Sequence, residues 1–147
     1  MDSSKDAAGV IPYRMKDGEI ELLLVQDAYT KKWNYPKGRI EEGESIFEAA
    51  LRELREETKL TPIRVHDHRP LNQYYSFRDG KEVVQRHVQL IIAEIDYDAQ
   101  IILQYAEVID DKWCTLDVLK CTTSFDNVQQ NARDAIRIIE SQMRQAA

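Results

Sequence analysis

The sequence predicts an α+β fold in which a mixed β-sheet is covered by helices on both faces. Strand-sized apolar segments recur along the chain, and two longer segments, residues 45–58 and 126–144, carry apolar side chains at the spacing of a helix. These strands and helices are interspersed without strict alternation, which favours a mixed sheet over a regular parallel one. At 147 residues, the chain is expected to form one domain, residues 1–147.

The first elements are expected to form a β-hairpin. Residues 7–14 and 20–26 have the composition of strands, and the Lys-Asp-Gly sequence at 16–18 is a turn signal between them. The polar residues 1–6 come before the first strand, and we expect them to form a flexible tail. Residues 27–44 show no periodic pattern, and a loop of that length points to a function.

The clearest helix of the chain begins after Ser45. Its residues Ile46, Ala50 and Leu54 fall on one face, as in a helix that packs against a sheet. Ser45 can cap this helix, with Glu48 as the partner in a capping box. The remaining predicted elements are strands at 63–72, 74–77, 83–95 and 108–114, a turn at 79–80, and the second amphipathic helix at 126–144.

Charge and cysteine content exclude several classes of protein. The chain has 26 Asp and Glu against 20 Lys and Arg, a net charge of −6. This balance argues against a membrane-surface protein or a binder of extended nucleic acid, because both use basic patches. Two cysteines cannot build a disulfide framework, and the apolar runs are strand-sized, with none that resembles a signal peptide. We therefore expect a cytoplasmic protein.

Three glutamates gather on one side of the predicted helix at 45–58. Glu53, Glu56 and Glu57 are spaced three and four residues apart, so their side chains fall within a narrow sector. Like charges this close repel, and a divalent cation such as Mg²⁺ or Mn²⁺, which prefers carboxylate oxygen, would neutralise them. The alternative is a solvated helix face on which Arg52 pairs with neighbouring glutamates.

The spacing around these glutamates resembles the signature of a known family. The chain has Gly38, five residues, Glu44, seven residues, and then Arg-Glu-Leu-Arg-Glu-Glu-Thr-Lys-Leu at 52–60. This pattern is similar to the Nudix box, and eight of its nine specified positions match. The departure is Lys59, where the family has a glycine that ends the helix.

The resemblance implies a Nudix-like α/β/α sandwich and a Mg²⁺-dependent hydrolase of a nucleoside diphosphate linked to another group. Metal bound to pyrophosphate oxygens would neutralise their charge while water attacks phosphorus, and one carboxylate would take the proton of the water. Glu44 and Arg52 would orient the carboxylates. The implied metal ligands are the carboxylates of Glu53, Glu56 and Glu57 and the carbonyl oxygen of Gly38.

Two segments are candidates for binding the substrate. Residues 31–39 carry four cations, no acid and two aromatic side chains, so that Lys37 and Arg39 can meet phosphates. Trp33 and Tyr35 either stack on a base or pack at the edge of the core. The second segment, residues 74–81, holds aromatic residues that stack a base or enter the core, followed by a cation that can bind phosphate. Its candidates for substrate binding are Tyr75 and Lys81.

Within the Nudix family, residues 8–14, 20–24 and 33–38 look like the asymmetric diadenosine tetraphosphate hydrolase branch. Glu107 lies six residues before Trp113, similar to a distal glutamate of that branch, and the resemblance makes it a candidate general base or metal ligand. The alternative for Glu107 is a solvated loop carboxylate.

We therefore expect cleavage of diadenosine tetraphosphate to ATP and AMP, with a small nucleotide polyphosphate as partner and the oligomeric state left open. The segment after Glu107 is also similar to deoxynucleoside and dihydroneopterin triphosphate pyrophosphatases, which release a monophosphate and pyrophosphate. Hydrolysis at RNA 5′ ends is less favoured, because no extended basic groove is evident. A binding module that senses nucleotides without turnover is the non-enzymatic alternative, and such modules can dispense with the glutamates that this chain retains.

Overall fold

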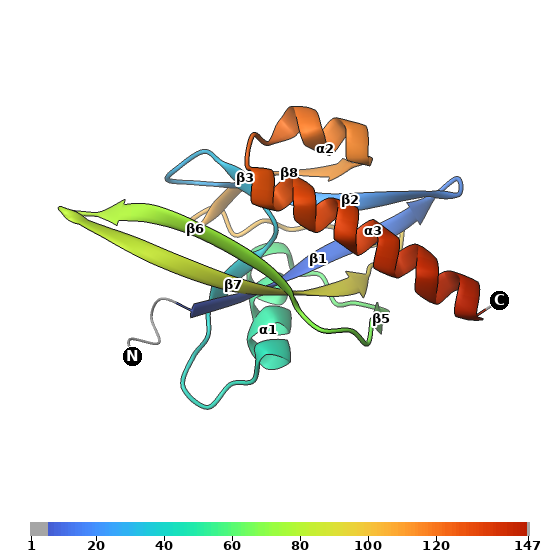
Figure 1. Cartoon of the computed structure of the whole chain (residues 1–147). Helices are drawn as coiled ribbons and strands as arrows, with labels where there is room; N and C mark the ends of the chain where they lie inside the picture. The colour runs from blue at the N-terminus through green and yellow to red at the C-terminus, as the bar shows by residue number, and fades with distance from the viewer. Residues whose placement is uncertain (1–5, 147) are drawn as a thin grey trace.

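The computed structural model describes residues 6–146, and the predicted hairpin lies at the centre of its sheet (Figure 1). Strands β1 (Asp6–Lys16) and β2 (Glu19–Asp27) are antiparallel, and the turn between them uses positive φ angles at Asp17 and Gly18. Of the predicted tail 1–6, residues 1–5 lie outside the described residues, and residue 6 already belongs to β1. The hairpin is therefore confirmed, with a first strand that is longer than expected.

The sheet is mixed, as the sequence predicts. Strand β1 runs antiparallel to β2 on one side and parallel to β7 (Glu82–Glu94) on the other. Strand β6 (Leu71–Asp79) forms a second antiparallel hairpin with β7. The shorter strands at the margins are β3 (Trp33–Asn34) and β8 (Val108–Cys114), which pair with β2, β4 (Lys37–Arg39), which pairs with β1, and β5 (Arg64–Val65), which pairs with β7.

Helices cover both faces of this sheet. Helix α1 (Ile46–Thr58) lies on one face, and α2 (Leu116–Thr122) and α3 (Asp126–Ala146) lie on the other (Figure 1). None of the helices within residues 6–146 is long and apolar enough to cross a membrane.

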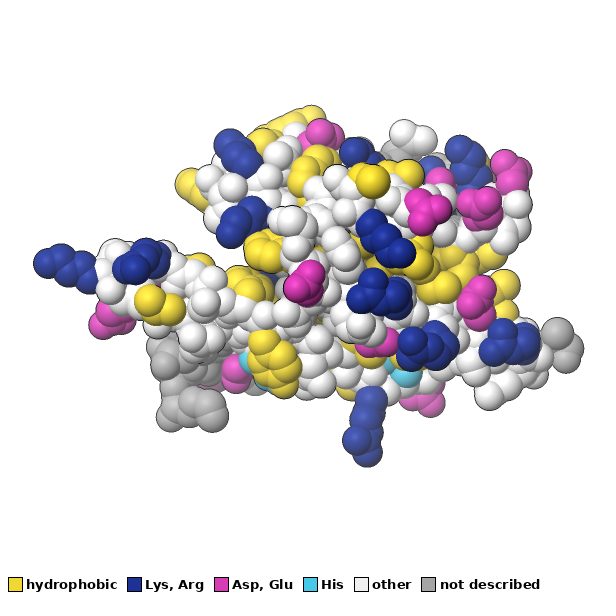
Figure 2. Space-filling model, turned by 45° about the horizontal axis from the view of Figure 1, so that its top comes forward, with side chains coloured by type: hydrophobic (Ala, Val, Ile, Leu, Met, Phe, Trp, Pro, Cys, Tyr) yellow, Lys and Arg dark blue, Asp and Glu magenta, His cyan; other side chains and the backbone are white. Residues whose placement is uncertain are grey.

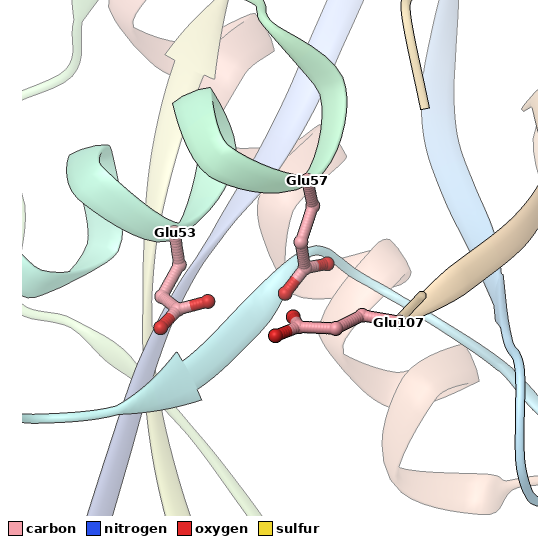
Figure 3. A group of neighbouring side chains, drawn as sticks. All are labelled: Glu53, Glu57 and Glu107. Atoms are coloured by element: carbon pink, nitrogen blue, oxygen red, sulfur yellow. The ribbon is translucent and has the colours of Figure 1, made fainter. Parts of the chain in front are cut away.

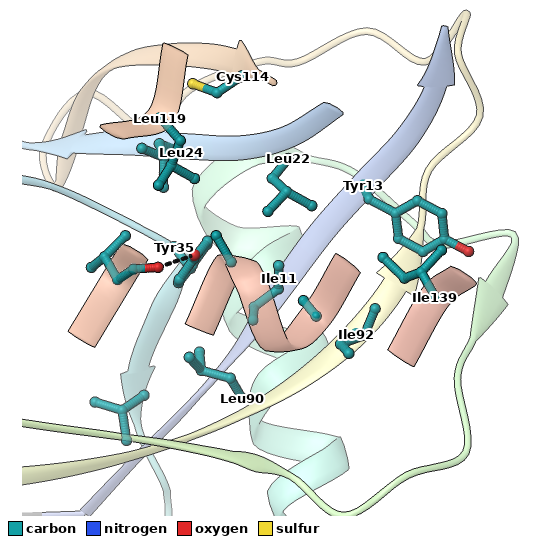
Figure 4. Packing of buried hydrophobic residues seen from close by; sticks show 14 of the residues in the cluster. Ile11, Tyr13, Leu22, Leu24, Tyr35, Leu90, Ile92, Cys114, Leu119 and Ile139 are labelled. Atoms are coloured by element: carbon teal, nitrogen blue, oxygen red, sulfur yellow. Dashed lines mark hydrogen bonds between the residues drawn. The ribbon is translucent and has the colours of Figure 1, made fainter. Parts of the chain in front are cut away.

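Each face of the sheet has its own buried apolar cluster. Successive side chains of a strand point to opposite faces, so that Val10 packs toward α1 with Leu54, and Ile11 packs toward α3 with Ile139 (Figure 4). Because both faces are covered, strands such as β2 are apolar at consecutive positions rather than at alternate ones.

Three expectations for the elements need correction. Residues 27–44 are not an uninterrupted loop, since β3 and β4 form within them. Residues 63–72 are not one strand, because β5 has only two residues and β6 continues unbroken to residue 79. Helix α2 was not predicted, because seven residues are too few to show a helical period.

Helix α1 begins and ends at the residues that the sequence indicates. The Ser45 hydroxyl accepts a hydrogen bond from the Glu48 backbone N–H, and the Glu48 carboxylate accepts one from the Ser45 backbone N–H, which completes the capping box. At the other end, Lys59 adopts a left-handed conformation with φ of 64°, and its N–H donates to the Arg55 carbonyl oxygen at 2.9 Å. A lysine thus occupies a conformation that favours glycine.

Replacing Lys59 by glycine is therefore expected to raise the free energy of unfolding by about 1 kcal/mol, since the left-handed conformation costs a residue with a Cβ about 1–2 kcal/mol. Urea unfolding checks this result. Lys59→Ala is the matched control, because it removes the charge and keeps the Cβ, and it is expected to give no gain. Equal stability of the glycine and alanine variants would contradict the assignment of this cost to the left-handed conformation of Lys59.

Candidate active site

Three carboxylates meet where the C-terminal half of α1 faces the loop before β8. Glu53 and Glu57 come from α1 and Glu107 from the loop, and one oxygen of each lies within 4.8 Å of the others. Figure 3 shows the three side chains pointing toward one another. Glu53 and Glu57 are only 8% and 4% exposed, which is rare for glutamate. A segment about fifty residues away in sequence thus completes an acidic group that begins on the helix.

The three carboxylates carry more negative charge than the neighbouring cations neutralise. Burial raises the pKa of Glu57, and the nearby charge of Glu53 raises it further, while Lys37 acts in the opposite direction. The pKa of Glu107 is also raised, by burial and then by the charges of Glu53 and Glu56. Three clustered carboxylate oxygens are a donor set that suits a hard divalent cation, so these residues fit the metal that the resemblance implies.

Gly38 lies directly against this group. A Cβ built on Gly38 would come within 2.1–2.4 Å of the carboxyl atoms of Glu53, a distance that no side chain tolerates. The position of Gly38 is set by β4, which pairs with β1 and places Gly38 opposite Ala8. Glycine is therefore required here by the close approach of backbone and carboxylate.

Arg52 holds two of the predicted carboxylates in place. Its Nε and Nη2 donate to the two carboxylate oxygens of Glu44 at 2.7 and 2.9 Å, and its Nη1 donates to Glu53 at 2.8 Å. Its Nη2 also donates to the backbone oxygen of Arg39 at 2.9 Å. The hydrogen bonds that Arg52 donates to Glu44 lower the pKa of Glu44 to about 2. Arg52 thus links the loop, the helix and the acidic group.

Glu56, a predicted metal ligand, lies outside the group of three. Its side chain is 48% exposed, and one of its oxygens lies 3.3 Å from Nη1 of Arg52. The reason is helical geometry, because Glu53 and Glu57 are one turn apart on the buried side, whereas position 56 turns toward solvent. Glu56 acts on the group through its charge, which raises the pKa of Glu107.

Three neighbouring cavities are lined by Lys37, and the carboxylates line two of them. A cavity of about 290 Å³ contains Glu57 and Glu107, and one of about 610 Å³ contains Gly38, Glu53 and Arg39. The largest, about 660 Å³, is lined by aromatic rings and cations of β6, β7 and the segment before α3. Tyr75 lies in this largest cavity, with Nζ of Lys37 at 5.3 Å from its ring centre.

Two of the predicted substrate-binding residues differ in their position: Tyr35 is buried in the core at the edge of the 290 Å³ cavity, whereas Lys81 lies away from all three cavities. Tyr35 is 1% exposed, and its hydroxyl donates to the Val128 carbonyl oxygen of α3 at 2.7 Å (Figure 4), so it takes the core role that the sequence left open. Lys81 lies in the turn between β6 and β7 and lines none of the three cavities formed by the described residues. Trp33 packs partly against the core, with Nζ of Lys112 at 5.5 Å from its ring centre.

Sequence reasoning missed a buried amide network that supports the loop before β4. Gln73 exchanges hydrogen bonds with Asn34 at 2.8 and 3.0 Å and donates to Asn131 of α3 at 3.1 Å. Asn34 in turn accepts from the backbone N–H of Tyr35 at 2.7 Å. A signal was present, since Asn131 lies three residues after Val128 on the apolar side of the predicted helix.

Comparison with known proteins agrees with this geometry. Residues 3–137 match the NUDIX domain family. The asymmetrical bis(5′-nucleosyl)-tetraphosphatase of Caenorhabditis elegans is 32% identical over 114 residues, which cover 76% of this chain and 79% of that protein. Among solved structures, a C. elegans Ap4A hydrolase binary complex superposes with a TM-score of 0.73 at 25% identity, over 94% of this chain and 96% of the other.

The NUDIX domain of Shewanella oneidensis NrtR, solved with ADP ribose, superposes with a TM-score of 0.70 at 26% identity, over 92% of this chain and 90% of that one. The family match spans the sheet, the three carboxylates and most of α3. The chain therefore belongs to the Nudix family and is a hydrolase that acts on phosphoric anhydride bonds.

Proposed function

We propose that this enzyme hydrolyses diadenosine tetraphosphate to ATP and AMP and depends on Mg²⁺ or Mn²⁺. One observation carries the proposal: the carboxylate group opens, past Lys37, into a cavity of about 660 Å³ that contains both cations and aromatic rings. Cations suit the phosphates of such a substrate, and a ring such as Tyr75 suits its base. The 32% identity with the asymmetrical bis(5′-nucleosyl)-tetraphosphatase of C. elegans supports the same substrate.

Glu53, Glu57 and Glu107 would hold the divalent cation, with Gly38 backing the group. When bound, the cation supplies charge neutralisation at the phosphate oxygens and lowers the pKa of a nucleophilic water. The requirement for Gly38 and the fixed orientation of Glu53 by Arg52 both support a site built to hold carboxylates at a set distance.

The chain's own residues supply the remaining chemistry. Glu107 is the most exposed of the three carboxylates, so its oxygen that does not face the cation suits the acceptance of the proton of the attacking water. The water oxygen forms a bond to phosphorus, the bond from that phosphorus to the bridging oxygen breaks, and the bridging oxygen leaves with the second product as an anion. Lys37 would hold the phosphates in line for this displacement.

The α2–α3 face offers no continuous basic stripe to an extended nucleic acid (Figure 2). Lys and Arg side chains on this face are interspersed with Asp and Glu and do not form a continuous stripe (Figure 2). A binder of long nucleic acid requires such a stripe.

Product analysis tests the proposed function. Diadenosine tetraphosphate incubated with the enzyme and Mg²⁺ is expected to give ATP and AMP in equal amounts by ion-exchange chromatography, and EDTA is expected to stop the reaction. The same panel should contain deoxynucleoside triphosphates, dihydroneopterin triphosphate and 5′-triphosphorylated RNA. Release of a monophosphate and pyrophosphate from a triphosphate, with diadenosine tetraphosphate left intact, would replace the proposal with a triphosphate pyrophosphatase.

A further inference from the structure

The segment between β7 and β8, residues 95–107, forms neither helix nor strand, yet it is bound to the end of α1. The last carbonyl groups of a helix have no partner within the helix. The backbone N–H of Ile102 donates to the Thr58 carbonyl oxygen at 3.0 Å. The backbone N–H of Gln104 donates to the Glu57 carbonyl oxygen at the same distance of 3.0 Å. The segment therefore supplies partners for two of the last carbonyl groups of α1.

The side chains of residues 101–104 explain why this part of the segment lies against α1. Ile101 and Leu103 pack against the apolar cluster between α1 and the sheet. Ile102 is 62% exposed, and Gln104 is exposed as well. This alternation is typical of an extended chain with one face on an apolar surface, and in such a chain the N–H groups of residues two apart point the same way. Apolar packing thus directs the N–H groups of residues 102 and 104 toward the helix end.

The backbone of Gln104 also begins the turn that carries Glu107. The Gln104 carbonyl oxygen accepts hydrogen bonds from the backbone N–H groups of Glu107 at 2.9 Å and Val108 at 3.0 Å. Through its own N–H group the same residue is bound to Glu57. Gln104 therefore connects the backbones of Glu57 and Glu107, which are about fifty residues apart in the sequence.

The position of the Glu107 carboxylate depends on this backbone. Glu107 is exposed, unlike Glu53 and Glu57, so packing restrains its side chain little. Its carbonyl oxygen accepts a hydrogen bond from the Ala28 N–H at 2.8 Å, which holds the other side of the residue. One oxygen of each of the three carboxylates lies within 4.8 Å of the others, so a small shift of the turn would take Glu107 out of the group (Figure 3).

We propose that Gln104 is a positioning residue, whose backbone holds Glu107 at its place in the acidic group. Its N–H fixes the segment to the end of α1 beside Glu57, and its carbonyl oxygen fixes the turn that presents Glu107. This inference rests on the proposed function only in taking a divalent cation as the ligand of the three carboxylates. It does not depend on which nucleotide is the substrate.

Proline at position 104 tests this role, because it removes the N–H group and leaves the carbonyl oxygen in place. The extended conformation of Leu103 is the one that suits a residue before proline. Gln104→Pro is expected to weaken Mn²⁺ binding about tenfold, as measured by electron paramagnetic resonance, because groups that orient metal ligands have effects of this size. Gln104→Ala, which keeps the N–H group, is expected to recover the affinity.

Hydrogen exchange of backbone amides, measured in EDTA, tests the same contact without metal or turnover. In the wild-type protein the amide of Gln104 is expected to exchange slowly, although the residue is exposed. In Gln104→Pro the amide of Glu107 is expected to exchange about tenfold faster, because the turn is no longer fixed to α1. Fast exchange of the Gln104 amide in the wild type, or unchanged exchange of the Glu107 amide in the variant, would overturn the proposal.

A double-mutant cycle with Glu107→Gln separates positioning from a general loosening of the loop. If Gln104 acts through Glu107, Gln104→Pro should weaken Mn²⁺ binding no further once the Glu107 carboxylate is absent. Additive losses would show that the bond to α1 acts independently of Glu107 and would contradict the proposal. Should Glu107→Gln bind Mn²⁺ like the wild type, the ligand role that the proposed function gives to Glu107 fails, while the amide exchange still decides whether Gln104 holds that residue.

Tyr105→Pro is the matched control, because it places proline in the same turn and keeps the N–H group of Gln104. Tyr105 is the second residue of the turn that the Glu107 N–H closes, a position at which proline is favoured. It is 70% exposed and lines none of the three cavities formed by the described residues. This variant is expected to match the wild type in Mn²⁺ affinity and in the exchange of the Glu107 amide.

Discussion

Replacing Glu57 by glutamine is expected to lower kcat about a thousandfold or more and, in EDTA, to raise the free energy of unfolding. The loss of activity follows because Glu57 lies at the centre of the acidic group and the amide cannot supply an anionic ligand or accept a proton. Product formation at saturating substrate and Mg²⁺ measures the first effect, and urea unfolding measures the second.

The gain in stability follows from the raised pKa of Glu57. Burial and the charge of Glu53 make the folded protein hold a proton on Glu57 more tightly than the unfolded chain does. The ionised form therefore costs stability, and this cost appears as the pH rises above the ordinary pKa of a glutamate. Glutamine removes the cost, so the stability of the variant should fall less than that of the wild type as the pH rises above that ordinary value.

Glu140→Gln provides the matched control, since Glu140 is an exposed residue of α3 far from the box in sequence. It should change neither kcat nor the pH dependence of unfolding. Unchanged turnover in Glu57→Gln would remove the carboxylate group from the mechanism, and a loss of stability would show that the ionised Glu57 side chain stabilises the fold.

The parts of the fold that the sequence predicts well are those set by neighbouring residues. Helix α1 depends on the Ser45 cap and on a 3.6-residue period, both of which are local. The meeting of Glu107 with that helix depends instead on β8 pairing with β2, which no local pattern reveals, so only the family resemblance pointed to it. The burial of Tyr35 likewise depends on Val128, 93 residues further on.

The residue that lies opposite Tyr75 in the β6–β7 hairpin was within reach of sequence reasoning. The turn at 79–80 was predicted, and counting back from the pair Asp79 and Glu82 places Tyr75 opposite Arg86. What the register does not show is that Lys37 approaches Tyr75 from another part of the sheet. The cavity between them is a tertiary feature, so the sequence did not indicate that Lys81, in the turn of this hairpin, lies away from its lining.

Replacing Gly38 by alanine is expected to lower kcat about a hundredfold or more, because the added methyl group would occupy the space of the Glu53 carboxyl group. Glu53 would then leave its hydrogen bond with Arg52 and its place beside Glu57. The affinity for Mn²⁺, measured by electron paramagnetic resonance, should fall in parallel.

Gly43→Ala separates this effect from a general intolerance of the loop. Gly43 lies in the loop that follows β4, with φ of 83°, and a Cβ there would meet no atom within 4 Å. Its replacement should cost about 1 kcal/mol of stability through backbone strain and leave kcat and Mn²⁺ affinity intact. Gly38, by contrast, has an ordinary φ, so its requirement comes from space alone. If Gly38→Ala retained full activity and Mn²⁺ affinity, the contact of β4 with Glu53 would have no part in holding the acidic group, and the backbone of the box would act only as a connection between sheet and helix.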